Sequence, residues 1–299
     1  MTKRIIYTDK NMRELKLPLD GRFPLRVENE RLSDYLHSTV PFHWHPAVEF
    51  AYVVQGSVIC QANDTVRRLE PGNGMFFNTN TLHAYFPVEK KDCVYKAILF
   101  DPSLLGLPGS FIYEERIVPI LSNPASFGLF LAPAVNWQQE LLAILEQIVS
   151  LVPAKVPCPE LQNLELLARL WRILYENTSG AEDKLPRSSW RDIERMKQAM
   201  LYIQQSYDGP VTLEDIAASC SLSQSECCRL FNRILHQSPM EYVISCRIEK
   251  SLPLLAEGRL SVTEIAGMTG FQSSSYFAET FKKQTGMTPS SYRKEHLNR

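Results

Sequence analysis

The stretch "TLEDIAASCSLSQSECCRLFNRILHQSP" at residues 212–239 has a close counterpart in "SVTEIAGMTGFQSSSYFAETFKKQTGMTP" at residues 261–289. Each copy opens with a hydroxyl residue and an acidic residue three positions later, which is the capping-box pattern of a helix start. The two boxes are Thr212 with Asp215 and Ser261 with Glu264. In both copies an Ile-Ala pair, a turn and a second helical segment follow. The repeat predicts two helix-turn-helix motifs, at about 213–234 and 261–284.

The residue types in each motif indicate how its two helices pack. The small alanine lets the helices cross closely, and an apolar residue in the turn, Leu222 or Phe271, fills the space between them. The second helix then presents its polar face outward, as a helix that enters a major groove does. Between the motifs, "MEYVISCRIEKSLPLLAEG" (240–258) predicts an amphipathic helix that sets their spacing at roughly 34 Å, one turn of DNA. Pro253 predicts a kink or an early end of this helix.

Residues from about 190 to 295 resemble the DNA-binding domain of the AraC/XylS family of transcription regulators. The most specific part of the resemblance is "IAGMTGFQSSSYFAETFKKQTGMTPSSYR" at residues 265–293. The N-terminal half is similar to the cupin-type effector domain that many family members carry. The resemblance implies a sequence-specific regulator, often an activator, that binds double-stranded DNA, RNA polymerase and a small-molecule effector such as a sugar. It also implies a homodimer without enzymatic activity.

On the second helix of the first motif, the resemblance places DNA contacts at Gln224, Ser225, Cys228, Arg229 and Arg233. Arg229 is the strongest candidate for reading a base, because a guanidinium can donate two parallel hydrogen bonds to guanine. The alternative is that Arg229 contacts a phosphate or only solvent. Cys227 and Cys228 point about 100° apart on a helix, with Cys227 toward the core. A disulfide between them would distort the helix, so a redox switch is disfavoured.

The corresponding face of the second motif carries Gln272, Ser273, Ser274, Ser275, Glu279, Lys282 and Lys283. Glu279 departs from the family pattern, in which a basic residue is frequent. Phosphates repel a carboxylate, unless it accepts a hydrogen bond from cytosine N4. We therefore expect the second motif to contact mainly the DNA backbone, through the two lysines and the Ser-capped helix start. Seven apolar residues are expected in the core of the two motifs: Leu230, Phe231, Ile265, Ala266, Phe271, Phe277 and Phe281.

The N-terminal half combines strands with helices, so the chain is predicted to be an α+β protein of several domains. Short runs between turn residues at about 22–100 predict a β-barrel of the cupin-like jelly-roll type. Apolar residues at helical spacing predict helices at 136–152 and 158–177. The broad apolar face of the second helix either packs in the core of its own domain or forms a dimer seam.

The predicted domains follow from these patterns. An arm at 1–21, or a disordered terminus, precedes the effector domain at 22–177, whose appended helices lie at 136–177. The polar stretch at 178–189 is the predicted linker, and an all-α DNA-binding domain fills 190–299.

Two elements of the predicted barrel bring together residue types that bind metal ions. "HWHPAVEFAYVVQG" (43–56) has the cupin pattern HxHx3Ex6G, and "GNGMFFNTNTLH" (72–83) supplies a third histidine. Three imidazoles and a carboxylate around one point suit Fe, Mn, Ni or Zn. The candidate ligands are His43, His45, Glu49 and His83.

Three interpretations of these residues stay open. The second element departs from the cupin pattern at Asn78, Asn80 and Pro87, and related regulators commonly bind an organic effector here without metal. The imidazoles would then hydrogen-bond the effector while Trp44 or Tyr52 stacks on it. The second interpretation adds a divalent transition metal to the same pocket, and the third makes the histidines structural. A rival functional class is a metal-dependent cupin enzyme, an isomerase or dioxygenase, fused to a DNA-binding module.

Composition limits the functional classes further. With 299 residues, 44% of them hydrophobic and 22% charged, the chain has the makeup of about two globular domains. No apolar run nears the roughly 18–20 residues that span a bilayer, so no membrane partner is expected. The first residues lack the pattern of a signal peptide, and we expect a cytoplasmic protein. The net charge of −1 does not point to nucleic acid, and seven cysteines without metal-type spacing are typical of free thiols.

Overall fold

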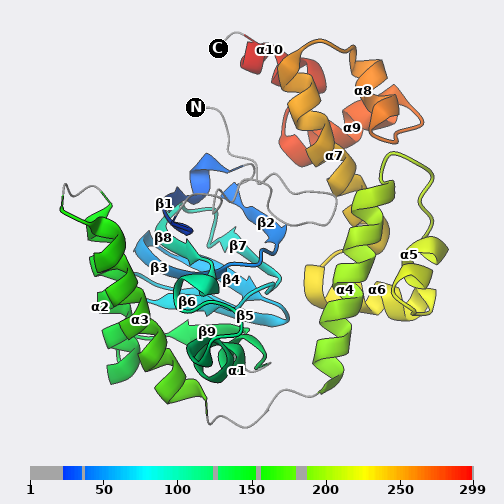
Figure 1. Ribbon diagram of the computed structural model, residues 1–299. Coiled ribbons are helices and arrows are strands. Elements are labelled where there is room, and N and C mark those ends of the chain that lie inside the picture. Colours follow the sequence, from blue (N-terminus) through cyan, green and yellow to red (C-terminus); the bar gives the residue numbers. More distant parts are fainter. Residues whose placement is uncertain (1–22, 36–37, 124–126, 153–155, 180–186, 298–299) are drawn as a thin grey trace. The chain divides into compact units, whose positions relative to one another are not determined.

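The computed structural model describes residues 23–35, 38–123, 127–152, 156–179 and 187–297 (Figure 1). The chain divides between residues 189 and 190 into an N-terminal and a C-terminal unit. The described strands all lie in the N-terminal unit, and the described part of the C-terminal unit is helical, as the α+β prediction requires. The expected arm at 1–21 lies outside the described residues. None of the described helices is long and apolar enough to cross a membrane.

The strands of the N-terminal unit form two antiparallel sheets, with the orders β1-β8-β3-β6-β9 and β2-β7-β4-β5. The predicted barrel is therefore a sandwich of two sheets, as in a jelly roll. The strands are β1 (Leu25–Arg31), β2 (Val40–His43), β3 (Val48–Gly56), β4 (Val58–Ala62), β5 (Thr65–Leu69), β6 (Gly74–Phe77), β7 (His83–Pro87), β8 (Cys93–Phe100) and β9 (Gly128–Leu131).

Strand β9 extends the larger sheet beyond residue 100, where the sequence prediction ended the barrel. It pairs with β6 at the edge of the sheet. Its four residues, "GLFL", are too few to display the alternation that identifies a strand from sequence. A short helix, α1 (Val118–Leu121), precedes it.

Strand β3 is the centre of the larger sheet, and its two faces belong to different cores. Phe50 and Tyr52 face an apolar layer shared with α2 (Asn136–Leu151) and α3 (Pro159–Thr178), which lie along one side of the sheets in Figure 1. Ala51 and Val53 face the interior of the sandwich, between the two sheets. Because side chains alternate along a strand, β3 separates the helix-facing core from the sandwich interior.

Helix α3 uses part of its apolar face for the core of its own unit. Leu167, Leu170 and Leu174 are buried with α2 against the sheet, which confirms the core interpretation for this side. Leu161, on the neighbouring stripe, is 67% exposed, and Ala168 is also exposed. This second stripe is the part of α3 that remains available to a partner or a ligand.

The C-terminal unit begins within the first turn of α4 (Arg187–Ser206), a helix that starts inside the predicted linker at 178–189. The first turn of this helix is polar, so its sequence did not distinguish it from a linker. The helices that follow are α5 (Leu213–Ser219), α6 (Gln224–Leu235), α7 (Pro239–Glu257), α8 (Val262–Met268), α9 (Ser274–Thr285) and α10 (Pro289–Leu297). Helices α5 and α6 form the first helix-turn-helix motif, and α8 and α9 form the second.

The two motifs share the same turn. One turn residue is left-handed in each, Ser221 with φ 57° and Gly270 with φ 80°. The amide N–H of the next residue donates to the motif's alanine carbonyl in both copies. These bonds run from Leu222 to Ala217, at 3.0 Å, and from Phe271 to Ala266, at 2.9 Å. The sequence repeat is thus a repeat of backbone geometry.

Capping boxes start both motifs, as predicted from the sequence. Two further boxes, Ser223 with Glu226 and Ser238 with Glu241, start α6 and α7. The seven apolar residues predicted for the core are confirmed, since none is more than 5% exposed.

Pro253 does not end α7, which continues to Glu257, so the prediction of an early end was wrong. Proline removes one backbone donor, at a cost of about 3 kcal/mol in a helix interior. Leu252 and Leu255 on either side are fully buried, and this packing holds the last turn in place.

Candidate functional site

The four candidate metal ligands come together inside the sandwich. His43 on β2 lies directly opposite His83 on β7, while His45 follows β2 and Glu49 lies on β3. The exposed fractions of these residues are 4%, 1%, 1% and 4%, respectively. The sequence therefore predicted a cluster that the fold assembles, and it is closed to solvent.

Each imidazole is held through its Nδ1 atom by a backbone carbonyl two residues away. The distances are 2.9 Å from His43 to Pro41, 3.0 Å from His45 to Ala47 and 2.8 Å from His83 to Thr81. A carbonyl only accepts hydrogen bonds, so Nδ1 carries the proton in all three rings. In a neutral ring, Nε2 then holds a lone pair, which is the form that binds a metal ion.

Glu49 lies among these Nε2 atoms. Its Oε2 is 3.1 Å from Nε2 of His45 and 3.3 Å from Nε2 of His83, although the second contact lacks hydrogen-bond geometry. Burial opposes ionisation of Glu49, but the neighbouring His83 and His45 hold its pKa well below the usual range. Burial, together with His83 and His45, lowers the pKa of His43 well below its usual value. The cluster thus combines an ionised carboxylate with at least one neutral imidazole.

Tyr85 is a member of the cluster that the sequence prediction omitted. Its hydroxyl donates to Oε1 of Glu49 at 2.9 Å. Burial raises the pKa of Tyr85 well above its usual range, so the phenol keeps the proton that it donates. The signal was present in the sequence, because positions 83 and 85 of one strand point to the same face.

The donor set fits a divalent transition metal. One ligand atom from each of His43, His45 and His83 lies within 4.8 Å of the other two. The lone pairs of neutral imidazoles repel a carboxylate at hydrogen-bond distance unless a proton or a cation lies between them. Backbone carbonyls already fix the rings in the orientation that such an ion requires.

One of the two aromatic residues expected beside the effector lies apart from this cluster. Tyr52 faces the helix-covered side of β3, opposite to Glu49, because positions 49 and 52 have opposite parity on the strand. Tyr52 therefore does not line the interior that holds the histidine cluster. Trp44 lies between the two histidines in sequence and is half-buried.

The departures from the cupin pattern preserve the backbone geometry. Asn80 adopts φ 57°, the left-handed conformation for which glycine is the usual choice and which asparagine tolerates. Buried Asn78 donates to the carbonyls of Ile120 and Leu121, at 2.8 and 3.2 Å. The second cupin element, residues 72–83, thus differs from the cupin pattern in sequence but still places His83 in the cluster.

The first recognition helix, α6, has one buried and one exposed face. Cys227 is fully buried and Cys228 is half-buried, as predicted. Gln224, Ser225 and Arg229 are exposed, and Arg229 forms no ion pair with any described residue. Arg233 differs, because its guanidinium is paired with Asp192 of α4. Of the two arginines on α6, Arg229 is therefore the one whose guanidinium is not paired with a carboxylate of a described residue.

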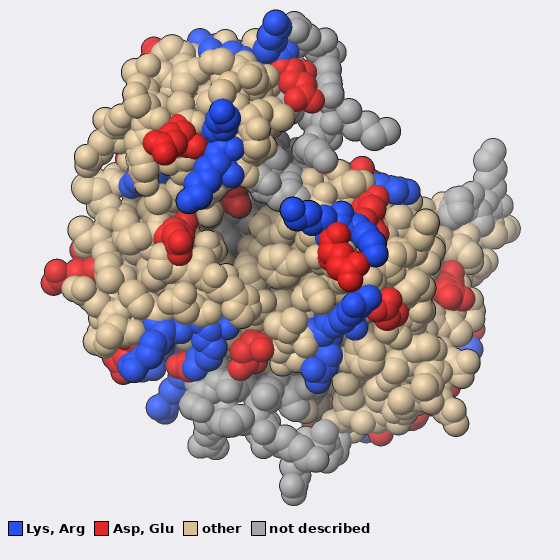
Figure 2. All heavy atoms as spheres, turned by 180° about the vertical axis from the view of Figure 1, so that it is seen from behind, with Lys and Arg blue, Asp and Glu red and all other residues tan. Residues whose placement is uncertain are grey.

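The second recognition helix, α9, exposes the predicted polar residues. Gln272, Ser273, Ser275, Glu279, Lys282 and Lys283 are exposed, and Ser274 is half-buried. Charges of both signs therefore share this surface. On the face of the molecule in Figure 2, lysine and arginine side chains are likewise interspersed with acidic ones. No single-sign patch marks that face, in keeping with the net charge of −1.

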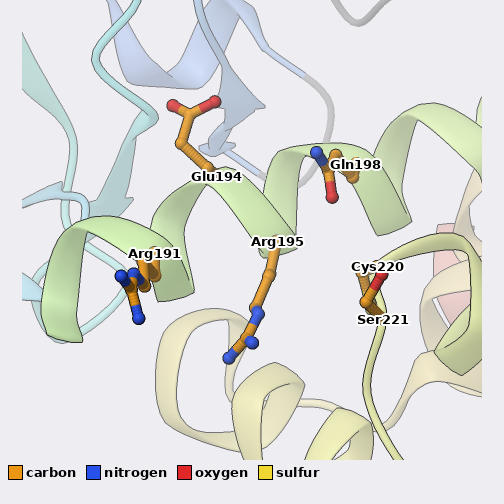
Figure 3. A pocket seen from close by; sticks show the side chains of 6 residues that line it. All are labelled: Arg191, Glu194, Arg195, Gln198, Cys220 and Ser221. Atoms are coloured by element: carbon orange, nitrogen blue, oxygen red, sulfur yellow. The ribbon is translucent and has the colours of Figure 1, made fainter.

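A hollow of about 340 Å³ lies beside the turn of the first motif. Figure 3 shows Arg195 extending from α4 toward the helices of this motif, while Glu194 points the opposite way. Cys220 and Ser221 line the hollow from the turn. Arg191 and Arg195 thus flank the first motif one helical turn apart, and the sequence prediction assigned them no role.

Arg247 of α7 links the segment between α4 and α5 to the second motif. Its Nε donates to the Tyr207 carbonyl at 2.7 Å, and its Nη2 donates to the Gly209 carbonyl at 2.9 Å. The same guanidinium lies 5.8 Å from the ring centre of Phe271, in the turn of the second motif. A Cβ on Gly270 would come within 2.3 Å of the Tyr207 carbonyl oxygen, so only glycine permits this approach.

Replacing this guanidinium by the Arg247→Met change should destabilise the C-terminal unit by about 1–3 kcal/mol, because two carbonyls lose their charged donor. Hydrogen exchange at the amides of α7, α8 and α9 measures the loss. Arg259→Met is the matched control, since Arg259 is exposed. Equal protection in the two variants would refute a linking role for Arg247.

Comparison with known proteins gives two family matches. A helix-turn-helix domain model matches residues 216–295, and the AraC-like ligand binding domain matches residues 30–185. The uncharacterized HTH-type transcriptional regulator YdeC of Bacillus subtilis is 32% identical over 286 residues, which cover 96% of this chain and 97% of that protein. The melibiose operon regulatory protein of Escherichia coli K12 is 27% identical over 258 residues, with coverages of 84% and 83%. Among solved structures, ToxT from Vibrio cholerae is 14% identical, covers 90% of this chain and 97% of its own, and has a TM-score of 0.44.

Proposed function

The chain belongs to the AraC family of transcription regulators, and from this premise we propose how its residues bind DNA and ligand. It is a ligand-responsive, sequence-specific DNA-binding regulator and not an enzyme, which decides against the rival cupin-enzyme prediction. The observation that carries our assignment is the exposed face of α6, where Arg229 projects opposite a buried apolar face.

We propose that α6 reads bases and α9 mainly contacts the backbone. Arg229 can donate two parallel hydrogen bonds to a guanine in the major groove. Gln224, Ser225 and Cys228 share its exposed or half-exposed face. On α9, Lys282 and Lys283 supply phosphate contacts, and Glu279 accepts from cytosine N4 where it meets a base.

Footprinting on the protein's own promoter region tests this function. Two protected major-groove segments about one helical turn apart on one side of the duplex are expected, because the second motif repeats the first. Protection of a single segment would leave the second motif without a DNA contact and would contradict the proposal.

The regulator is proposed to act as a homodimer in the cytoplasm and to contact RNA polymerase. Support for a dimer comes from the start of α3, where Leu161 is 67% exposed. A cytoplasmic location is what binding to a chromosomal operator requires. The contact with RNA polymerase rests on the family alone.

For the histidine cluster, we propose the divalent metal ion of the second interpretation, without an organic effector in the same pocket. His43, His45 and His83 would hold the ion through Nε2, and Glu49 would balance its charge. A bound ion would supply positive charge beside the buried carboxylate of Glu49 without a second proton on His45 or His83. A sugar-like effector would need open space beside the imidazoles, whereas these side chains are no more than 4% exposed.

A further inference from the structure

A cavity of about 420 Å³ lies on the helix-covered side of the N-terminal unit. Its floor consists of Trp171 and Ile117, which belong to the apolar layer between the sheet and the helices. The histidine cluster lies on the other face of the larger sheet, so the two sites are separate. The cavity has the size of a small-molecule site and is mostly apolar.

The backbone of one wall is irregular for an identifiable reason. Residues Tyr113–Ile117 form a π-helical turn, and Pro119 follows in α1. Proline has no N–H to donate to the carbonyl of Glu115, four residues earlier. The side chain of Arg116 takes that place, its Nη1 donating to the Glu115 carbonyl at 2.8 Å. Trp171 then ties the turn to α3, because its Nε1 donates to the Arg116 carbonyl at 3.0 Å.

Arg116 is held at the rim of the cavity by aromatic rings. Its guanidinium carbon lies 5.3 Å from the ring centre of Phe111 and 5.5 Å from that of Tyr175. The other arginine of the cavity, Arg172, is already paired with both carboxylate oxygens of Glu176, at 2.8 Å each. Among the described residues, Arg116 has no carboxylate partner, so its charge is available to an anion.

We propose that this cavity binds an organic carboxylate with an apolar body. The carboxylate pairs with Arg116, and the apolar body covers Trp171 and Ile117. A guanidinium that is oriented beforehand by two rings matches a planar carboxylate and loses little freedom on binding. A neutral sugar would leave this charge unpaired, and an inorganic anion would leave the apolar floor exposed.

The position of the cavity indicates how such a ligand acts, and this part rests on the proposed regulator function. Ala168, Trp171 and Tyr175 line the cavity from α3, which ends at Thr178, the first residue of the predicted linker. A ligand that contacts this last stretch of α3 stabilises the arrangement of the helix that it binds more tightly. Binding therefore shifts the population toward that arrangement.

Calorimetric titration of the full-length protein with octanoate tests the site. Octanoate should bind with one equivalent per chain, while octanol and acetate, which each lack one half of the required chemistry, should bind at least about 10-fold more weakly. Octanol binding as tightly as octanoate would overturn the proposal, because the charge of Arg116 would then contribute nothing.

Three variants sharpen this test. Arg116→Met keeps an unbranched side chain between the rings and removes the charge, and it should weaken octanoate binding by roughly 10- to 100-fold. Ala168→Phe should weaken binding by filling the cavity without any change of charge. Arg169→Met is the matched control, since Arg169 lies on the same helix and is paired with Glu140. Unchanged affinity in both cavity variants would overturn the site.

Two further measurements separate this proposal from others. Operator binding by the ligand-free protein tests the regulator function separately. If the protein binds its operator but does not bind octanoate, only the carboxylate site is refuted. Sedimentation velocity identifies the competing occupant of the cavity. If Ala168→Phe dissociates a dimer and octanoate does not bind, a second copy of the chain covers this surface and the proposal is wrong.

Discussion

The His83→Ala variant is expected to lose stoichiometric binding of Zn²⁺, with the affinity falling by more than about 100-fold. Removal of a group that merely supports a metal ligand typically costs 10- to 100-fold in affinity, and a ligand itself contributes more. His83 is the right position because Thr81 fixes its ring and its Nε2 has no hydrogen-bond partner among the described residues. Metal analysis after reconstitution and dialysis, followed by chelator competition, gives the affinity.

Two companion variants make this result specific. Tyr85→Phe removes only the hydrogen bond to Glu49 and should weaken the metal by roughly 10-fold. His236→Asn is the matched control, because His236 is an exposed histidine in the left-handed cap of α6, a conformation that asparagine tolerates. If wild-type protein retains neither Zn²⁺ nor Fe²⁺, Mn²⁺ or Ni²⁺ after reconstitution, the metal interpretation is wrong and an organic effector or a structural role remains.

The Arg229→Ala change is expected to weaken operator binding by about 1–3 kcal/mol, or roughly 10- to 150-fold, at fixed salt. It should also relax selectivity at one base pair, because a bidentate contact with guanine distinguishes that base from the others. The fold should be unaffected, since Arg229 is exposed and forms no ion pair with the described residues. Fluorescence anisotropy with operator variants substituted at single base pairs measures both effects.

Arg233→Ala, at the other arginine that the resemblance places at the DNA, is expected to weaken operator binding less than Arg229→Ala. Arg233 is paired with Asp192 on the surface, and exposed ion pairs contribute less than about 1 kcal/mol. A uniform loss of affinity for all sequences in Arg229→Ala, together with a reduced salt dependence, would show that Arg229 contacts a phosphate. The assignment of base readout would then fail.

The parts of the site that the sequence predicted are those determined by spacing. The histidines, Glu49 and the two helix-turn-helix motifs come from short local patterns, and the fold brings each pattern into the expected conformation. Strand parity alone also puts Tyr52 on the face opposite to Glu49, and Tyr85 on the same face as His83.

Other features depend on contacts between distant segments and could not be predicted. Strand β9 forms because it pairs with β6 at the edge of the sheet. Helix α7 continues beyond Pro253 because the neighbouring leucines are buried. The cavity beside Arg116 requires the π-helical turn and α3 to meet across more than 50 residues. No local pattern contains that information.

The capping boxes that start α5, α6, α7 and α8 also bear on how quickly the molecule folds. Each box joins residues only three positions apart, whereas the sandwich pairs β1 with β8 across about 70 residues. Proteins dominated by local contacts fold in microseconds to milliseconds, and β-sandwiches take milliseconds to seconds. After thermal stress, the DNA-binding unit should therefore refold before the sensing unit. A refolding regulator would then be able to meet its operator before it can respond to a ligand.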